Sequence, residues 1–230
     1  MASRRPSNPL ALAVLVLLTE RPMHPYQMSA TLRERRKEDS IKINYGSLYS
    51  VVESLHKRGF IEARETVREG RRPERTVYAI TGSGESLMTE WLSELLSNPA
   101  KEFPEFEAAL SLMPALPPDE VVDLLERRLS AQRESLDAGR AMLEKTAAMG
   151  MPRIFSVEHE YETEMLAAEV RFLENLLDDL RAGSFGGLGG WRRIHELRAA
   201  GMSQEAIEAV LHEEFREEYA WVDKIAHSTE

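Results

Sequence analysis

A run of small and hydroxyl-bearing residues opens a segment whose apolar spacing is that of a helix. In INYGSLYSVVESLHKRGF, residues 41–60, the leading turn carries one glycine, one serine and two tyrosines. An acid is the usual residue there because it complements the helix dipole, but this turn has none. Glycine permits close approach, hydroxyls donate hydrogen bonds, and free backbone N–H groups attract a phosphate. These residue types predict contact with DNA.

The first turns of this helix are the predicted DNA face. From residue type and position, we expect contacts from Tyr45, Gly46, Ser47, Tyr49 and Ser50. An apolar stripe at helical spacing would hold the helix to the body of the domain, and it consists of Leu48, Val51, Val52 and Leu55. The alternative for Tyr45 and Tyr49 is that they are packing aromatics whose hydroxyls reach water.

A basic turn follows about ten residues after this helix. Within eight positions it contains Arg68, Arg71, Arg72 and Arg75, diluted by Glu69 and Glu74. A solvated basic turn needs no function by itself. Beside a DNA-reading helix, however, it predicts a wing that lies along the backbone or enters the minor groove, because the planar guanidinium matches phosphate.

Proline and glycine residues mark the expected ends of the helices and strands that must position these residues. We expect three helices over residues 8–20, 26–38 and 44–58, with Asn8 and Asn44 as N-caps. A hairpin of strands 60–67 and 75–81 comes next, followed by a helix over residues 82–96. This order predicts a mainly α protein with an N-terminal winged helix-turn-helix domain and a two-stranded wing.

The chain then changes to long helical segments. Residues 119–149 carry a heptad seam of Val122, Leu125, Leu129, Gln132, Leu136, Gly139 and Leu143. The segment 156–181 is expected to be a second long helix that carries Tyr161, Met165, Ala168, Phe172, Leu176 and Leu180 on one side. The two can form a hairpin within one chain or a dimerisation arm. We favour the dimer, since two lone helices bury little apolar surface.

Composition suggests four segments along the chain. Residues 1–98 form the expected winged domain and residues 99–182 the helical dimerisation domain, while residues 183–190 are a glycine-rich linker. Residues 191–230 are a helical appendix whose pattern resembles a second helix-turn-helix. The appendix has 5 basic and 9 acidic residues, which phosphates would repel, so we interpret it as packing or partner-binding helices.

Charge is unevenly distributed between the two halves of the chain. The 230 residues carry a net charge of −10, but residues 1–80 hold 15 basic and 9 acidic residues, a balance of +6, and the remainder is at −16. Such asymmetry is typical of one part that meets a polyanion and another that meets protein. It argues against the alternative that the winged domain only binds protein.

Cysteine is absent, which favours a reducing, cytoplasmic location. The longest apolar run, Leu10–Leu18, is shorter than the roughly 17 residues that a membrane span needs. The basic residues ahead of it resemble the start of a signal peptide, but TERPMHP follows where a cleavage site should be. We therefore expect a buried first helix and a cytoplasmic protein.

The sequence contains no pattern that predicts an enzyme. Its six histidines are scattered, and it lacks a nucleophile elbow, a phosphate loop and an HExxH motif. Glu158, His159 and Glu162 can share a helix face as metal ligands, but we favour a solvated charged face. We predict no catalytic residue, no metal and no cofactor.

Three segments together resemble the PadR-like family of transcriptional regulators. They are HPYQM, INYGSLYSVVESLHKRGFIEA and GRRPERTVYAITGSGESLM, in that order and spacing, and the resemblance extends over residues 10–96. It implies a homodimeric repressor that binds an inverted-repeat operator in double-stranded DNA. It also implies release of the DNA by a small phenolic or hydrophobic effector.

The resemblance also assigns roles by position. Tyr26 and Gln27 would contact phosphate, and the groove contacts would be Asn44, Tyr45, Ser47 and Tyr49. The wing contacts would be Arg71, Arg72 and Arg75, and we include Lys42 in the predicted DNA-binding set. Pro73 and Glu74 interrupt the wing where many members continue with basic residues, which weakens the assignment of individual wing contacts.

An effector site is the last feature that the sequence suggests. Trp91, with Met88 and Leu92 nearby, can line a pocket for a flat or irregular hydrophobic ligand. The alternative, which we favour, is a tryptophan that braces the junction of two domains.

Overall fold

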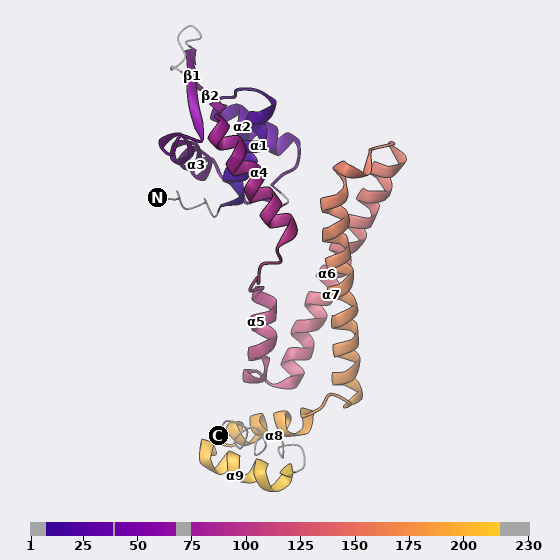
Figure 1. Cartoon of the computed structure of the whole chain (residues 1–230). Coiled ribbons are helices and arrows are strands. Elements are labelled where there is room, and N and C mark those ends of the chain that lie inside the picture. The colour runs from indigo at the N-terminus through magenta and orange to yellow at the C-terminus, as the bar shows by residue number, and fades with distance from the viewer. Residues whose placement is uncertain (1–7, 39, 68–74, 217–230) are drawn as a thin grey trace. The chain divides into compact units, whose positions relative to one another are not determined.

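The computed structural model describes residues 8–38, 40–67 and 75–216. The chain divides into two compact units, Met1–Glu102 and Phe103–Glu230. In the first unit (Figure 1), the elements in chain order are α1 Pro9–Glu20, α2 Pro25–Glu34, α3 Tyr45–Lys57, β1 Ile61–Val67, β2 Arg75–Ile80 and α4 Gly82–Ser97. The expected order of three helices, a hairpin and a fourth helix is confirmed.

Helix α1 forms the centre of the first unit. Asn8 caps it by accepting a hydrogen bond from the Leu10 backbone N–H at 3.0 Å, and Pro9 occupies the first helical position. Proline suits that position because its missing N–H has no partner in a helix start. Most of the apolar run is buried, and α1 packs against α3, β2 and α4. The expectation of a buried first helix is confirmed.

Helix α2 begins with a reciprocal cap that the sequence did not suggest. His24 Nδ1 accepts from the Tyr26 N–H at 3.1 Å, and Gln27 Oε1 accepts from the His24 N–H at 3.0 Å. Our expected end at residue 38 is wrong, because α2 ends at Glu34 and Arg36 adopts a left-handed φ of 55°. A non-glycine residue in that conformation ends the helix without the glycine that usually marks such a site.

Helix α3 is held by the predicted stripe. Leu48, Val52 and Leu55 are buried at 0–2% exposure, and Val51 is half-buried. Gly59, at φ 77°, supplies the left-handed residue that turns the chain from α3 into β1. The buried stripe confirms the sequence analysis.

The hairpin is tied to the helices at both ends. Strands β1 and β2 pair antiparallel, with Ile61 opposite Ile80. Met23, between α1 and α2, exchanges two backbone hydrogen bonds of 3.0 Å with Tyr78 of β2. Helix α4 begins at the N-cap Thr81, and a Cβ at Gly84 would collide with the Phe60 carbonyl oxygen. The base of the wing is therefore fixed against the helical body.

The described residues of the second unit form helices joined by short turns, with no strand among them. Its elements are α5 Glu105–Leu112, η1 Met113–Ala115, α6 Pro118–Ala148, η2 Arg153–Phe155, α7 Val157–Ala182, α8 Leu188–Ala199 and α9 Gln204–Glu214. Helices α6 and α7 form a long antiparallel hairpin (Figure 1). On α6 the predicted seam is confirmed at Leu125, Leu129 and Leu136, which are buried.

The predicted side of α7 is only partly buried within the single chain. Leu176 and Leu180 are buried, but Tyr161, Met165 and Phe172 are 69%, 55% and 47% exposed. The side that faces α6 instead carries Thr163, Ala167, Val170, Leu173 and Leu177. The two helices approach closely where a Cβ at Gly139 would lie 2.9 Å from Thr163 Oγ1. The seam thus combines the small or polar Thr163 and Ala167 with larger apolar residues, whereas Tyr161, Met165 and Phe172 lie outside it.

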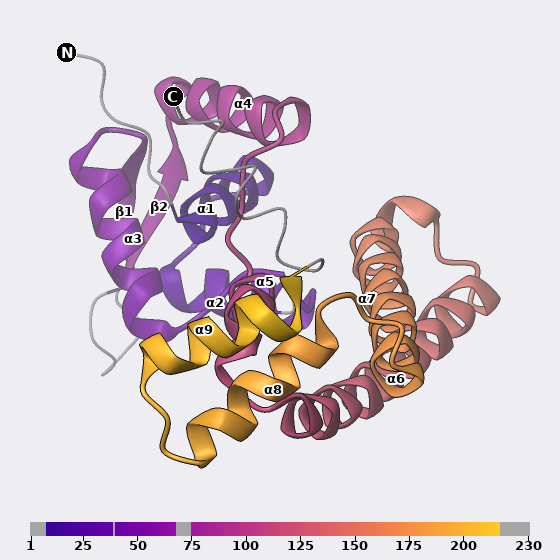
Figure 2. The same cartoon turned by 90° about the horizontal axis from the view of Figure 1, so that it is seen from below.

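Helices α8 and α9 (Figure 2) pack as a pair on a small core of Leu197, Ile207 and Leu211. Trp191 is buried in the core of the α6–α7 hairpin, and its indole N–H donates to the Leu116 carbonyl oxygen at 2.9 Å. Helix α8 begins at Leu188, so the last three residues of the predicted linker are helical. None of the described helices is both long enough and apolar enough to cross a membrane.

Candidate nucleic-acid interface

The first turns of α3 present small polar groups at the surface. Gly46 and Ser50 are exposed, Tyr49 is 44% exposed, and Ser47 is half-buried. The Ser47 hydroxyl donates to the Asn44 carbonyl at 3.0 Å and the Ser50 hydroxyl to the Gly46 carbonyl at 3.0 Å. Each hydroxyl keeps lone pairs that accept hydrogen bonds. Tyr45 opens α3, and its side chain lies outside the described residues.

The Asn44 side chain caps α3 in addition to its predicted contact with DNA. Its Oδ1 accepts from the Ser47 backbone N–H at 2.6 Å and caps α3. The carboxamide NH₂ still carries two donors. The side chain can therefore cap the helix through oxygen and contact a partner through nitrogen.

The residues before α3 that are predicted to contact DNA lie at the start of α2 and in the segment between α2 and α3. Tyr26 is 56% exposed at the first turn of α2, and Gln27 is also exposed. Gln27 Oε1 is engaged by the α2 cap, so its donors rather than its oxygen are available to a phosphate. Lys42 is exposed two residues before Asn44. Helix α2 packs against α3, as a helix-turn-helix pair requires.

Electrostatically, the leading turn of α3 is free of carboxylates. Glu53 comes two turns later and is paired with Lys57 at 2.7 Å. The hydrogen bond from Lys57 lowers the pKa of Glu53, so the two form an ionised but mutually neutralised pair. The exposed side of α3 therefore has no uncompensated acid within its described side chains.

The wing predictions fall mostly outside the described part of the chain. Arg71 and Arg72 lie there, while Arg75 begins β2 with a side chain that is not described. Their contacts stay predictions. The two strands that would carry them are anchored to the body through Tyr78 and Ile61, the latter 1% exposed.

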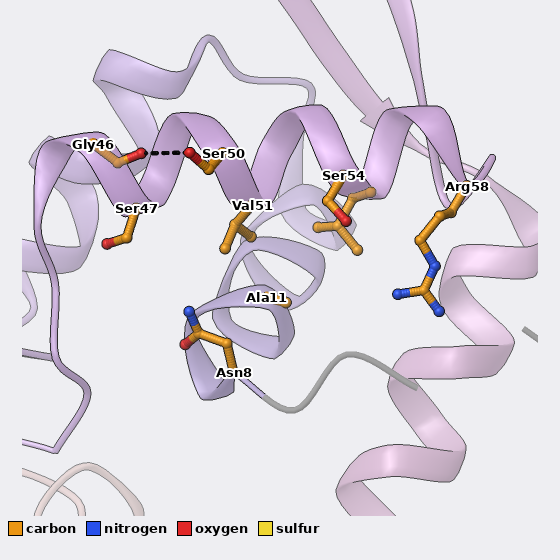
Figure 3. Close-up of a pocket in the computed structure, with 9 residues that line it drawn as sticks. Asn8, Ala11, Gly46, Ser47, Ser50, Val51, Ser54 and Arg58 are labelled. Atoms are coloured by element: carbon orange, nitrogen blue, oxygen red, sulfur yellow. Dashed lines mark hydrogen bonds between the residues drawn. The ribbon is translucent and has the colours of Figure 1, made fainter. Parts of the chain in front are cut away.

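A groove runs beside α3 that the sequence analysis did not anticipate (Figure 3). It has a volume of about 420 Å³, and we call it the α1–α3 groove. It is lined by Asn8, Ala11, Gly46, Ser47, Ser50, Val51, Ser54, Leu55 and Arg58. The spacing of Ser50, Ser54 and Arg58, four residues apart, was the sequence signal that could have placed them along one side of the helix.

The predicted effector residues differ in their surroundings. Trp91 is 2% exposed and belongs to the core of the first unit, Met88 is half-buried against that core, and Leu92 is 41% exposed. A ligand that touches the face of Trp91 must displace core side chains. The role of these three residues in effector binding stays a prediction.

The charged face of α7 shows pairing within the chain. His159 Nδ1 lies 3.5 Å from Glu162 Oε2. Over the described ranges, no cluster of three His, Cys, Asp or Glu side chains is arranged to hold a metal ion.

Helix α3 packs on α2, and the β1–β2 hairpin follows α3 and is anchored to the helices. These features define a winged helix-turn-helix protein. Residues 14–90 match the family model described as Transcriptional regulator PadR-like family. These residues extend from α1 into α4. This segment of the chain is therefore similar to the PadR-like family, and the resemblance in its motifs is confirmed.

Individual relatives extend the similarity beyond this segment. The negative transcriptional regulator PadR of Bacillus subtilis is 25% identical over 147 residues, which are 64% of this chain and 80% of that relative. The crystal structure of Bacillus subtilis PadR in complex with operator DNA has a TM-score of 0.61 at 23% identity, over 75% of this chain and 99% of that one. The Vibrio cholerae virulence activator AphA has a TM-score of 0.56 at 15% identity, over 75% and 98% of the two chains. At these identities the structural likeness shows the fold.

We expect substitution of Asn44 to separate capping from DNA contact. Asn44→Asp keeps an oxygen for the Ser47 N–H, so the melting temperature should hold, while the added negative charge should weaken binding to a duplex. Asn44→Ala removes the cap and should cost about 0.5–2 kcal/mol of stability. Thermal unfolding and duplex titration measure the two effects. Unchanged duplex affinity in Asn44→Asp would remove Asn44 from the interface.

Proposed function

We propose that the protein is a homodimeric, sequence-specific repressor that binds an inverted-repeat operator in double-stranded DNA. A small phenolic or hydrophobic effector releases it from the operator. In this proposal residues 1–98 bind DNA, residues 99–182 dimerise, and residues 183–190 link them to the appendix of residues 191–230.

The acid-free, exposed first turn of α3 is the observation that carries the DNA-binding proposal. Its outward-facing groups are a glycine backbone, serine hydroxyls and Tyr49, and Leu48 anchors the turn from behind at 0% exposure. In helix-turn-helix proteins this part of the second helix enters the major groove. The net charge of +6 over residues 1–80 favours approach to the phosphates.

Exposed apolar residues at one end of the α6–α7 hairpin support the dimer. They include Met149, Ile154, Phe155, Tyr161 and Met165, each more than half exposed. Several exposed large apolar residues within a short stretch of chain favour a contact with another protein. A second copy is the partner that an inverted-repeat operator requires, because the two-fold symmetry of the DNA matches that of a dimer.

The proposals of repression and of release by an effector are based on similarity to relatives. The relative at 25% identity is named a negative regulator. A crystal structure of Bacillus subtilis PadR in complex with p-coumaric acid, a phenolic acid, has a TM-score of 0.60 at 21% identity over 75% of this chain and 98% of that chain. We propose a ligand of the same chemical class for this chain.

We expect the protein to bind fragments of its own genome with an affinity that falls steeply with salt. A protein that neutralises 6–10 phosphates loses roughly 10³–10⁵ in affinity between 50 and 200 mM salt, since binding releases counterions. Gel shifts over a series of salt concentrations measure the slope. Binding that is absent, or that does not change with salt, would favour a winged-helix module that contacts protein instead.

We also expect Ile154→Asp to disrupt the dimer. Ile154 is 77% exposed in the single chain, so a carboxylate there costs the monomer little but would be desolvated in a dimer interface. Sedimentation should give two chains for the wild type and one for the variant. Ala138→Asp, on the exposed side of α6, is the matched control and should stay dimeric. A monomeric wild type, or a dimeric Ile154→Asp, would contradict the proposal.

A further inference from the structure

The α1–α3 groove follows one side of α3 from its first turn to its C-terminal end. Gly46, Ser50, Ser54 and Arg58 follow each other at intervals of four residues, and all of them line the α1–α3 groove. Figure 3 shows Ser54 and Arg58 extending from α3 on the side where Asn8 of α1 lies. The groove therefore joins the predicted DNA face to residues that were not predicted to contact DNA.

The chemistry of the groove favours an anion. The groups that can donate to an anion are the Asn8 carboxamide NH₂, the Ser54 hydroxyl and the Arg58 guanidinium, because the Ser47 and Ser50 hydroxyls donate within α3. None of the lining residues is acidic. Glu53, the acid on the described part of α3, is held by Lys57 at 2.7 Å and is not among the lining residues. Arg58 lies over the ring of Phe60, with its guanidinium carbon 5.0 Å from the ring centroid. Stacking of this kind fixes the plane in which a guanidinium directs its N–H donors.

The shape of the groove favours a nucleic-acid strand over a compact ion. Ala11, Val51 and Leu55 provide apolar lining between the polar groups, which suits the C–H groups of a sugar. From Ser47 to Arg58 the helix rises about 16 Å at 1.5 Å per residue. At roughly 3.4 Å of axial rise per nucleotide of a strand, this length spans several nucleotides. Sugars and phosphates alternate along such a strand, and the groove offers both apolar lining and hydrogen-bond donors.

We propose that the α1–α3 groove binds the sugar–phosphate backbone of the DNA strand that borders the major groove. Arg58 supplies the cation, and Ser54 supplies a hydroxyl donor. This inference rests on the proposed DNA-binding function, and it adds Asn8, Ser54 and Arg58 to the interface. Because the contact is to phosphate, it strengthens binding to every sequence equally and carries no base specificity.

The test compares Arg58→Gln with Arg127→Gln, which removes the same charge from an exposed position on α6. Each is titrated with a mixed-sequence duplex over a range of salt concentrations. A dimer carries two copies of Arg58, so Arg58→Gln should lower the slope of log K against log salt by about 1.8 and weaken binding about 60-fold at 0.1 M salt, the counterion effect of two phosphates. Arg127→Gln should match the wild type.

A second variant keeps the test independent of folding, because Arg58 also caps α3 and stacks on Phe60. Ser54 is exposed, so Ser54→Asp places a carboxylate in the groove without removing a buried contact. It should weaken duplex binding at an unchanged melting temperature, whereas the uncharged Ser54→Asn should bind like the wild type.

The outcomes separate this proposal from the function on which it rests. If the wild type binds duplex and both Arg58→Gln and Ser54→Asp bind with its affinity and salt slope, the groove proposal is overturned and DNA binding stands. If the wild type binds no duplex, both proposals fail together. If inorganic phosphate raises the melting temperature of the wild type but not of Arg58→Gln, and duplex binding is the same in both, the groove is a site for a free anion instead.

Discussion

Burial of one apolar stripe on α3 determines which side of that helix faces outward. Leu48, Val52 and Leu55 are almost fully buried against the core around α1, and burying such side chains stabilises a fold by about 1.5–3 kcal/mol each. Rotating α3 about its axis would expose them. The polar residues between them are therefore presented to solvent at fixed positions, with Asn44 and Gly59 setting where the helix begins and turns away.

The same packing places the remaining elements of the first unit around α3. Tyr78 bonds to the α1–α2 connection and its ring meets His56 of α3 edge-on, with centroids 5.5 Å apart. The wing strands are thus anchored to the end of α3 that is opposite its polar first turn. On the other side, the start of α1 and the α3 surface enclose the α1–α3 groove. A rigid helix between two such flanks is suited to lie between the two backbones of a major groove, which is about 12 Å wide.

Local signals in the sequence were sufficient for the winged part of the fold. Asn8, Asn44 and Gly59 mark helix ends through chemistry that each residue carries by itself. The end of α2 could not be predicted, because Arg36 adopts a left-handed φ without being glycine. The side of α7 that packs on α6 was not predicted from the sequence. It depends on the fit of Thr163 against Gly139, and that fit is defined only once the two helices pair. The groove was missed for a similar reason: Asn8 and Arg58 are distant in sequence and line one groove only because α1 packs on α3.

Hydrogen exchange of the backbone amides, with and without a DNA duplex at low salt, tests the central claim most directly. The first N–H groups of a helix lack partners within it, so those at the start of α3 should exchange readily in the free protein. The account predicts that duplex slows exchange over residues 44–50 and leaves α8 and α9 unchanged. Protection confined to other surfaces, with residues 44–50 unaffected, would contradict it.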